Sequence, residues 1–276
     1  MKSFLTIVIV LIIAAAGAFY YLQFDQEKEQ ATQPTKTEPL PLPQDTTPDI
    51  QHPITEPPVI IDSSPADLTE ELPSETVIEE PLPPLEDSDN QIKEILSNFF
   101  GDKLISQILN QTGFIHRFVV TIDSLPKKKL ATKYRVIPPT AGKFLVHKET
   151  NDTFTIDQDN FERYSMYMQL LSMLDTEQFV KWYKRYYPLI QEAYDGLGYK
   201  NLYFNDRFIF VIDHLLRTPT IEGQIQLVQP KVFYEYADPA LERLSAGQKI
   251  LLRIGPENRA IVEAKLTEIR KELATP

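Results

Sequence analysis

The chain of 276 residues contains no cysteine and only four histidines. Without cysteine there is no disulfide framework, no thiolate metal site and no lipid attachment through a thiol. The histidines, His52, His116, His147 and His214, are scattered along the chain and match no metal-binding motif. The sequence therefore predicts neither a metal nor a cofactor.

Signature motifs of catalysis are also missing. The sequence has no G-x-S-x-G, no G-x-x-x-x-G-K-[ST] and no H-E-x-x-H. Two carboxylates, Asp206 and Asp213, recur near one face of a predicted helix that also carries Arg217. Such a group can perform acid–base chemistry or hold a cation, so these two residues are the catalytic candidates. The simpler interpretation is that Asp206 complements the helix start and Asp213 pairs with Arg217.

Only one hydrophobic run is long. Residues 4–22, FLTIVIVLIIAAAGAFYYL, are uncharged, and a helix of this length spans about 28 Å, close to the ~30 Å hydrocarbon core of a bilayer. This pattern predicts a transmembrane anchor within residues 1–24. A cleaved signal peptide, with Lys2 before the run and a site near Ala16-Gly17-Ala18, is the alternative. The length of the run and its terminal aromatic residues favour a retained anchor in contact with the lipid bilayer.

Charge on the two sides of this run predicts its orientation. Lys2 precedes the run, whereas Asp25, Glu27 and Glu29 follow it. Because basic residues favour the cytoplasmic side, we expect a cytoplasmic amino terminus and a carboxy-terminal domain on the opposite side.

Glycine is absent from residues 25–88, which instead contain 13 prolines. This segment holds 16 Asp and Glu against two Lys, a balance of −14, whereas residues 89–276 hold 23 acidic and 25 basic residues, a balance of +2. A chain rich in proline and carboxylates buries too little apolar surface to fold, so residues 25–88 are predicted to be a disordered linker. The nearly neutral remainder gives no indication of nucleic-acid binding.

Residues 89–276 are predicted to form one compact domain of the mainly α class, with a minor α+β character from two short β elements. Predicted helices cover residues 114–125, 159–174, 175–197 and 256–273, while residues 144–156 form a hairpin and 224–236 short extended segments.

Local signals mark the ends of several of these helices. Asp159, Asp175, Asn205 and Ser245 are the expected N-caps, and Pro188 predicts a kink or two abutting helices.

An apolar stripe at helical spacing runs along the predicted helix 175–197. Phe179, Tyr183, Tyr186 and Ile190 belong to it. Aromatic residues can stack on sugars or bases, but this spacing favours core packing.

Acidic residues are absent between Ser124 and Lys148. The basic residues there are Lys127, Lys128, Lys129, Lys133, Arg135, Lys143 and Lys148. Such a run is a candidate binding surface for anionic glycans, phospholipid headgroups or the acidic linker, and the plainer interpretation is a solvated loop.

Several long motifs carry a family resemblance. NFERY, YYPLIQEAYDGLGY, NDRFIFVIDHLLRTP and LVQPKVFYEYADPALERLSAGQKILLRIGPEN, with IHRFVVTIDSLPKKKLA before them, resemble the bacterial domain of unknown function 3014. The resemblance covers about residues 90–273. It implies a Gram-negative protein of the inner membrane with its domain in the periplasm, and it brings no ligand or catalytic residue.

Together these features predict a single-pass envelope protein whose periplasmic helical domain binds or scaffolds another envelope component, such as a protein or an anionic glycan or lipid. The alternative is an envelope hydrolase that acts on cell-wall glycan or peptide through its carboxylates. A hydrolase should place Asp206 and Asp213 in a deep cleft, whereas a binding domain should leave its carboxylates paired.

Overall fold

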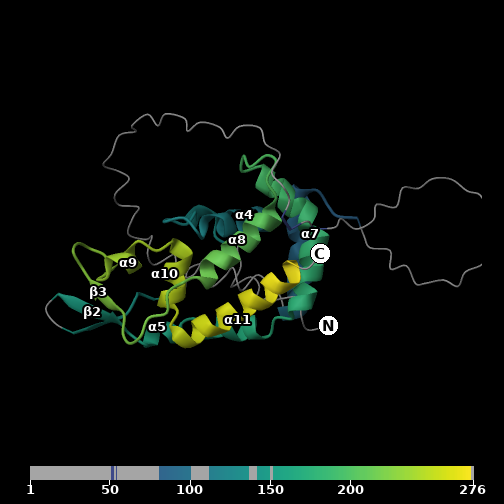
Figure 1. Cartoon of the computed structure of the whole chain (residues 1–276). Coiled ribbons are helices and arrows are strands. Elements are labelled where there is room, and N and C mark those ends of the chain that lie inside the picture. The colour runs from purple at the N-terminus through teal and green to yellow at the C-terminus, as the bar shows by residue number, and fades with distance from the viewer. Residues whose placement is uncertain are drawn as a thin grey trace, which may run out of the picture.

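The computed structural model describes residues 51–52, 54, 81–100, 112–136, 142–149 and 152–274. The helices pack together, and a small sheet lies at one end of them (Figure 1). The predicted span, residues 4–22, and most of the predicted linker lie outside the described residues. Within the described residues, no helix has both the length and the apolar character needed to cross a membrane.

The α-helices of the described residues are α2 (Ser88–Phe100), α4 (Phe114–Ser124), α5 (Asp159–Glu162), α6 (Ser165–Ser172), α7 (Thr176–Asp195), α8 (Phe204–Leu216), α9 (Pro239–Glu242), α10 (Ala246–Arg253) and α11 (Pro256–Leu273). The strands are β1 (Val146–Lys148), β2 (Thr153–Ile156), β3 (Gln226–Val228) and β4 (Glu235–Tyr236), and short 3-10 helices cover η2 (Leu85–Asp87) and η3 (Thr132–Tyr134). The mainly helical class is therefore confirmed.

The β elements form one sheet rather than two separate pieces. Its order is β1-β2-β3-β4 and every neighbouring pair is antiparallel. Phe154 of β2 lies opposite Leu227 of β3, which in turn lies opposite Tyr236 of β4. The sheet therefore joins the predicted hairpin to the extended segments about 70 residues further along the chain, and the sequence did not predict this pairing.

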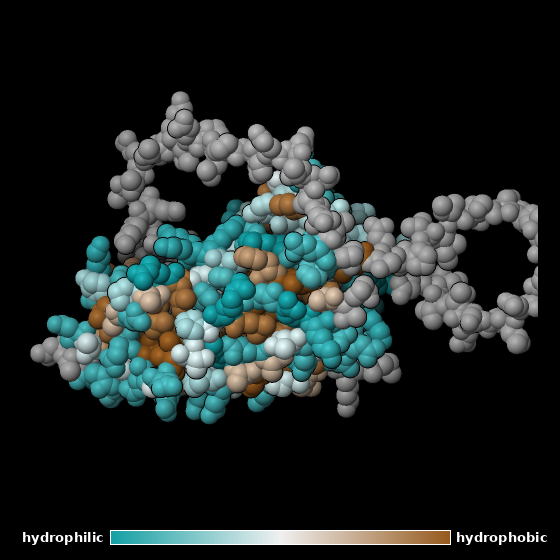
Figure 2. Space-filling model, viewed as in Figure 1, coloured by the Kyte–Doolittle hydropathy of each residue, from teal (hydrophilic) through white to brown (hydrophobic). Residues whose placement is uncertain are grey.

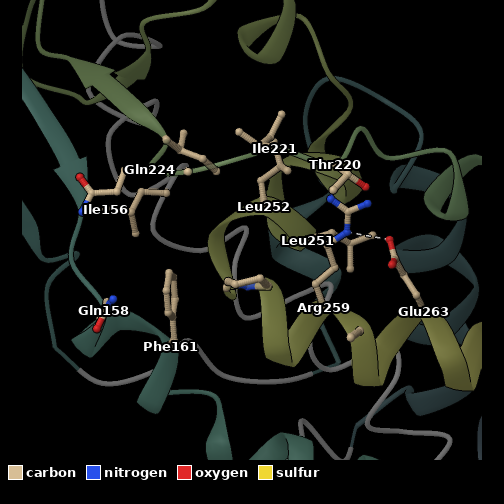
Figure 3. A pocket seen from close by; sticks show the side chains of 15 residues that line it. Ile156, Gln158, Phe161, Thr220, Ile221, Gln224, Leu251, Leu252, Arg259 and Glu263 are labelled. Carbon is tan, nitrogen blue, oxygen red and sulfur yellow. Dashed lines mark hydrogen bonds and ion pairs between the residues drawn. The ribbon is translucent and has the colours of Figure 1, made fainter.

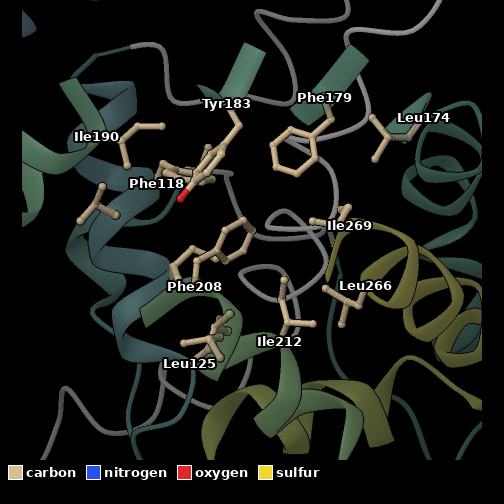
Figure 4. Close-up of a cluster of buried hydrophobic side chains, with 14 of the residues drawn as sticks. Phe118, Leu125, Leu174, Phe179, Tyr183, Ile190, Phe208, Ile212, Leu266 and Ile269 are labelled. Carbon is tan, nitrogen blue, oxygen red and sulfur yellow. The ribbon is translucent and has the colours of Figure 1, made fainter. Parts of the chain in front are cut away.

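The main hydrophobic core forms around α7. Tyr183 of α7 packs on Phe208 of α8 with ring centroids 5.6 Å apart, and Phe118 of α4 lies 6.1 Å from Phe208. Leu266 and Ile269 of α11 close the other side of this cluster (Figure 4). The aromatic stripe of α7 is therefore a core stripe, as its helical spacing predicted.

Helix α11 holds the helical part together. It packs along α6, α7 and α8, while α4 packs against α7 and α8 on the other side of the core (Figure 1). A smaller core under the sheet combines Leu227, Tyr236, Leu241 and Leu252. Leu252 belongs to α10, so this helix connects the sheet to the helical part.

Two of the expected caps are confirmed. The Asp175 side chain accepts from the backbone N–H of Gln178 at the start of α7. Ser245 and Gln248 form a reciprocal capping box at the start of α10. Both depend on residues three apart, which is why the sequence alone identifies them.

Other expectations at helix ends were wrong. Asn205 lies inside the first turn of α8, whose N-cap is Tyr203, and its side chain is buried. The predicted helix 159–174 is two helices, α5 and α6, and the N-cap of α5 is Gln158 rather than Asp159. Pro188 lies within a single helix, α7, so the prediction of two abutting helices was wrong, whereas the alternative of a kink stays a prediction.

Candidate functional site

A cavity among the described residues lies between the sheet and the start of α11. It has a volume of about 420 Å³. Its walls come from the end of β2 and α5, the connection from α8 to β3, and the junction of α10 with α11 (Figure 3). The lining residues are Ile156, Gln158, Phe161, Thr220, Ile221, Gly223, Gln224, Ile225, Leu251, Leu252, Gly255, Pro256, Arg259, Ala260 and Glu263. We refer to it as the apolar pocket.

One wall of the apolar pocket depends on Gly255. This residue has φ +90°, in the region that favours glycine, and Pro256 begins α11 immediately after it. A Cβ atom on Gly255 would lie 2.5 Å from the ring of Phe161. Asn258 also donates to the Phe161 carbonyl at 3.0 Å and to the Ile254 carbonyl at 2.8 Å. The close approach of Gly255 to Phe161 and the two hydrogen bonds of the Asn258 amide therefore hold α5 against the junction of α10 and α11.

The opposite wall is held by Arg259 of α11. Its guanidinium donates to the carbonyls of Thr218 and Pro219, at 2.6 and 2.7 Å. The same group pairs with Glu263, with Nε and Oε1 2.7 Å apart. Arg259 thus fixes the chain after α8, from which Ile221 and Ile225 reach into the apolar pocket.

The electrostatics of the apolar pocket favour an uncharged occupant. Arg259 and Glu263 are the charged residues among its lining, and they neutralise each other. The exposed residues Gln158 and Gln224 offer amide groups to a polar end of a ligand. Hydrophobic surface gathers on the same part of the molecule, between the sheet and the start of α11 (Figure 2). A cavity of this size lies within the range of small-molecule sites, about 300–1,000 Å³.

Asp213, one of the two predicted catalytic candidates, lies outside the apolar pocket. Its carboxylate takes two hydrogen bonds from Arg270 of α11, at 2.5 and 3.1 Å. The hydrogen bond and the negative charge of Asp213 raise the pKa of Arg270. The expected pairing with Arg217 was therefore wrong, because α11 presents a better-placed arginine from 57 residues further along.

Asp206, the other candidate, also lies outside the apolar pocket. Its two oxygens accept from the main-chain N–H groups of His52 and Gln51, at 2.8 and 3.3 Å. Asp206 and Asp213 are seven residues apart on α8, about 10 Å along its axis, and contact different segments. The structure does not bring them into one cleft.

The seven predicted basic binding residues fall into two regions. Lys127, Lys128, Lys129, Lys133 and Arg135 follow α4, whereas Lys143 and Lys148 belong to the region of the sheet. Burial lowers the pKa of Arg135, and its Nε donates to the Thr132 carbonyl. The six lysines are exposed, and their binding of an anionic partner stays a prediction.

A buried carboxylate, Asp123, organises the end of α4 and was missed from the sequence. Arg207 of α8 contacts it with Nε and Oδ1 2.9 Å apart, and the Lys127 ammonium lies 2.7 Å from Oδ2. Burial opposes the charged form of Lys127, yet Asp123 raises the pKa of this lysine. Tyr199 donates to the same carboxylate at 3.3 Å. Asp123 therefore stabilises the packing of α4 on α8, and the Lys127 ammonium is paired with this carboxylate.

A second buried charge lies beneath the sheet. Burial lowers the pKa of Lys249, a shift that can favour nucleophilic chemistry, but its ammonium is hydrogen-bonded to the Glu242 carboxylate. Glu242 also accepts from the Tyr236 N–H at 2.9 Å. These contacts tie α9, α10 and β4 together, so the pair supports the fold. Across the described residues, no cluster of three or more histidine, aspartate or glutamate side chains suits a metal ion.

His214 contacts the N-cap of α10. Its Nε2 lies 2.8 Å from the Ser245 hydroxyl, which also accepts from the Gln248 N–H. Burial, with the positive charges of Arg217 and Arg207, lowers the pKa of His214. A neutral imidazole therefore supports the capping box.

The sequence carried only a partial signal for the apolar pocket. Gly255-Pro256 was visible as the end of one helix and the start of the next. The partners of this junction, Phe161 and the chain after Leu216, are far away in sequence. No local pattern reports which distant elements meet there.

Comparisons with known proteins give a single result. Neither the curated proteins nor the solved structures gave a match. The model of a family described as a protein of unknown function, DUF3014, matches residues 114–270, from the start of α4 to near the end of α11. This range includes every residue that lines the apolar pocket. The chain therefore belongs to the DUF3014 family.

Proposed function

We propose that this protein is a membrane-anchored binding protein of the bacterial envelope, and that its helical domain binds an uncharged aliphatic molecule. The observation that carries the proposal is the apolar pocket, about 420 Å³ in volume and lined mainly by aliphatic and aromatic side chains. Its paired Arg259 and Glu263 leave no net charge for a charged ligand to meet. The uncharged run of residues 4–22 supports a membrane anchor. Lys2 before the run and Asp25, Glu27 and Glu29 after it support a domain on the periplasmic side of the inner membrane.

The ligand class follows from the lining. Ile156, Ile221, Ile225 and Leu252 offer alkyl surface without hydrogen-bonding groups. Burial of an alkyl chain there gains roughly 0.8 kcal/mol per CH₂. The amides of Gln158 and Gln224 suit a hydroxyl or carbonyl at one end of the ligand.

The alternative of a cell-wall hydrolase gains no support from its candidate residues. Asp213 is held by Arg270, and Asp206 accepts from the main chain of residues 51 and 52. Neither of them lines the apolar pocket. This pairing is the arrangement expected for a binding domain.

Photolabelling of the full chain tests the proposal. An uncharged long-chain alcohol that carries a diazirine should label peptides from the apolar pocket, as mapped by mass spectrometry. Ala260 lines the pocket, whereas Ala264, one turn further along α11, does not, and both are exposed. Ala260→Trp should fill the cavity and abolish this labelling, and Ala264→Trp should preserve it. Equal labelling of the two variants would reject the pocket as the binding site.

A further inference from the structure

A short segment from the predicted linker contacts the start of α8 through its main chain. The carboxylate of Asp206 accepts from the N–H groups of His52 and Gln51, at 2.8 and 3.3 Å. The side-chain amide of Asn205 donates to the His52 carbonyl at 2.9 Å. Ile54 packs against the main hydrophobic core. The polar contacts involve backbone atoms of the segment, which do not depend on its side chains.

Asn205, whose amide donates to the segment, is held in place by a buried neighbour. Asn205 is 0% exposed, and its Oδ1 accepts from the Tyr183 hydroxyl at 3.0 Å. Burial raises the pKa of Tyr183 well above its ordinary value, so this hydroxyl keeps its proton and donates it. With Oδ1 fixed in this way, the Asn205 nitrogen is directed toward the segment. A buried N–H group without an acceptor is costly, so this amide requires a carbonyl partner.

Asp206 completes the site with a second main-chain contact. A carboxylate in the first turn of a helix commonly complements the partial positive charge there. Asp206 lies in the first turn of α8, and its oxygens also bind two successive N–H groups, an arrangement that captures an anion between neighbouring peptide units. The two contacts lie 154 and 155 residues away in sequence, so they are tertiary rather than local.

We propose that Asn205 and Asp206 form a binding site for the main chain of a short peptide segment, and that Gln51, His52 and Ile54 of the chain's own linker occupy it. The site lies within the region that matches the family, residues 114–270, whereas its occupant lies outside that region. Because both belong to one chain, the effective concentration of the segment at the site is high. The site is separate from the apolar pocket and does not depend on the ligand proposed for it.

This contact changes the reach of the linker. If the segment is bound, residues 25–50 rather than 25–81 separate the predicted anchor from the domain, because Leu82 and Leu85 already pack against the main core. For a flexible coil this shortens the mean span from about 40 Å to about 30 Å. The peptide site therefore holds the domain nearer to the membrane.

Hydrogen exchange on the full chain, followed by NMR, tests the occupancy of the site. The amides of Gln51 and His52 should exchange at least about tenfold more slowly than those of an unbound peptide of the same sequence. Asp206→Ala should abolish this protection. Asp213→Ala on the same helix should not, because that carboxylate binds Arg270. Rapid exchange of both amides in the unaltered chain would overturn the proposal.

A second experiment changes the segment and leaves the domain intact. His52→Pro removes the N–H group that Asp206 binds, whereas His52→Ala retains it. A fluorescent peptide with the sequence of residues 47–56 should bind the full-length His52→Pro protein at least about tenfold more tightly than the His52→Ala protein, whose site is already occupied. Addition of Asp206→Ala to His52→Pro should abolish that gain. Equal affinity of the peptide for His52→Pro and His52→Ala would reject the site.

Discussion

Single residues determine whether the apolar pocket can form, and Gly255 is the clearest of them. Its φ of +90° and its contact with the ring of Phe161 leave no room for a side chain. Gly142 has a similar φ of +84°, but a Cβ atom added to it would meet no other atom within 4 Å. Substitution of alanine at Gly142 should therefore cost stability through backbone strain alone, whereas substitution at Gly255 should add a steric clash with Phe161.

Gly255→Ala should lower the free energy of unfolding by about 2–4 kcal/mol, because it adds overpacking against Phe161 to the backbone strain. Gly142→Ala should cost only about 1–2 kcal/mol, from strain alone. Urea denaturation of both variants measures the difference. Equal losses would show that Phe161 moves aside freely and that Gly255 does not shape the pocket wall.

The pKa of His214 gives the stability a pH dependence. Burial and the charges of Arg217 and Arg207 lower this pKa in the folded state, below the ordinary value of 6.5. As the pH falls below 6.5, the unfolded chain binds a proton that the folded chain does not, so stability decreases until the folded pKa is passed. His214→Gln, which does not titrate, should show a smaller decrease between about pH 7 and pH 5. Urea midpoints across this range measure it, and identical slopes would contradict the assignment.

Helices show most directly what the sequence can predict. Helix α4 and helix α11 were expected over residues 114–125 and 256–273 and are found at Phe114–Ser124 and Pro256–Leu273. Their signals are local, because apolar spacing and terminal residues lie within the helix itself. The pairing of β2 with β3 and the contact of Asp213 with Arg270 depend on which distant elements meet. The apolar pocket could not be predicted for the same reason, since several separate elements form its walls.

The interior Pro188 lowers the stability of helix α7. Pro188 is exposed and cannot donate to the carbonyl of Lys184. Pro188→Ala should restore this hydrogen bond and raise the free energy of unfolding by about 1–2 kcal/mol, after allowance for the greater freedom of the unfolded chain. Pro256→Ala, at the first position of α11 where no such bond is lost, should give no gain. Thermal unfolding compares them, and equal effects would contradict the explanation.

On the scale of the whole molecule, the proposal combines an anchor, a linker and a domain with two separate sites. Residues 4–22 are the predicted anchor, and the apolar pocket is the proposed ligand site. The start of α8 is the proposed peptide site, where Asp206 contacts Gln51 and His52. A bound linker would keep the apolar pocket close to the membrane, where aliphatic molecules concentrate.

The anchor prediction concerns the intact protein. The full chain should remain with the membrane fraction after a high-salt wash, and its intact mass should include residues 1–24, because the uncharged run is long enough to span the bilayer. Removal of residues 1–24 should release it into the soluble fraction. A soluble product of the full-length gene that begins near Phe19 would instead show cleavage of a signal peptide.

The most direct test of the proposed function is methyl NMR of the isotope-labelled protein during titration with an uncharged long-chain alcohol. Methyl signals of Ile156, Ile221 and Leu252, which line the apolar pocket, should shift and reach saturation. Those of Ile190 and Ile212, buried in the main core, should stay unchanged. Shifts that never saturate, or that affect the pocket and the core equally, would contradict the binding of an aliphatic ligand in the apolar pocket.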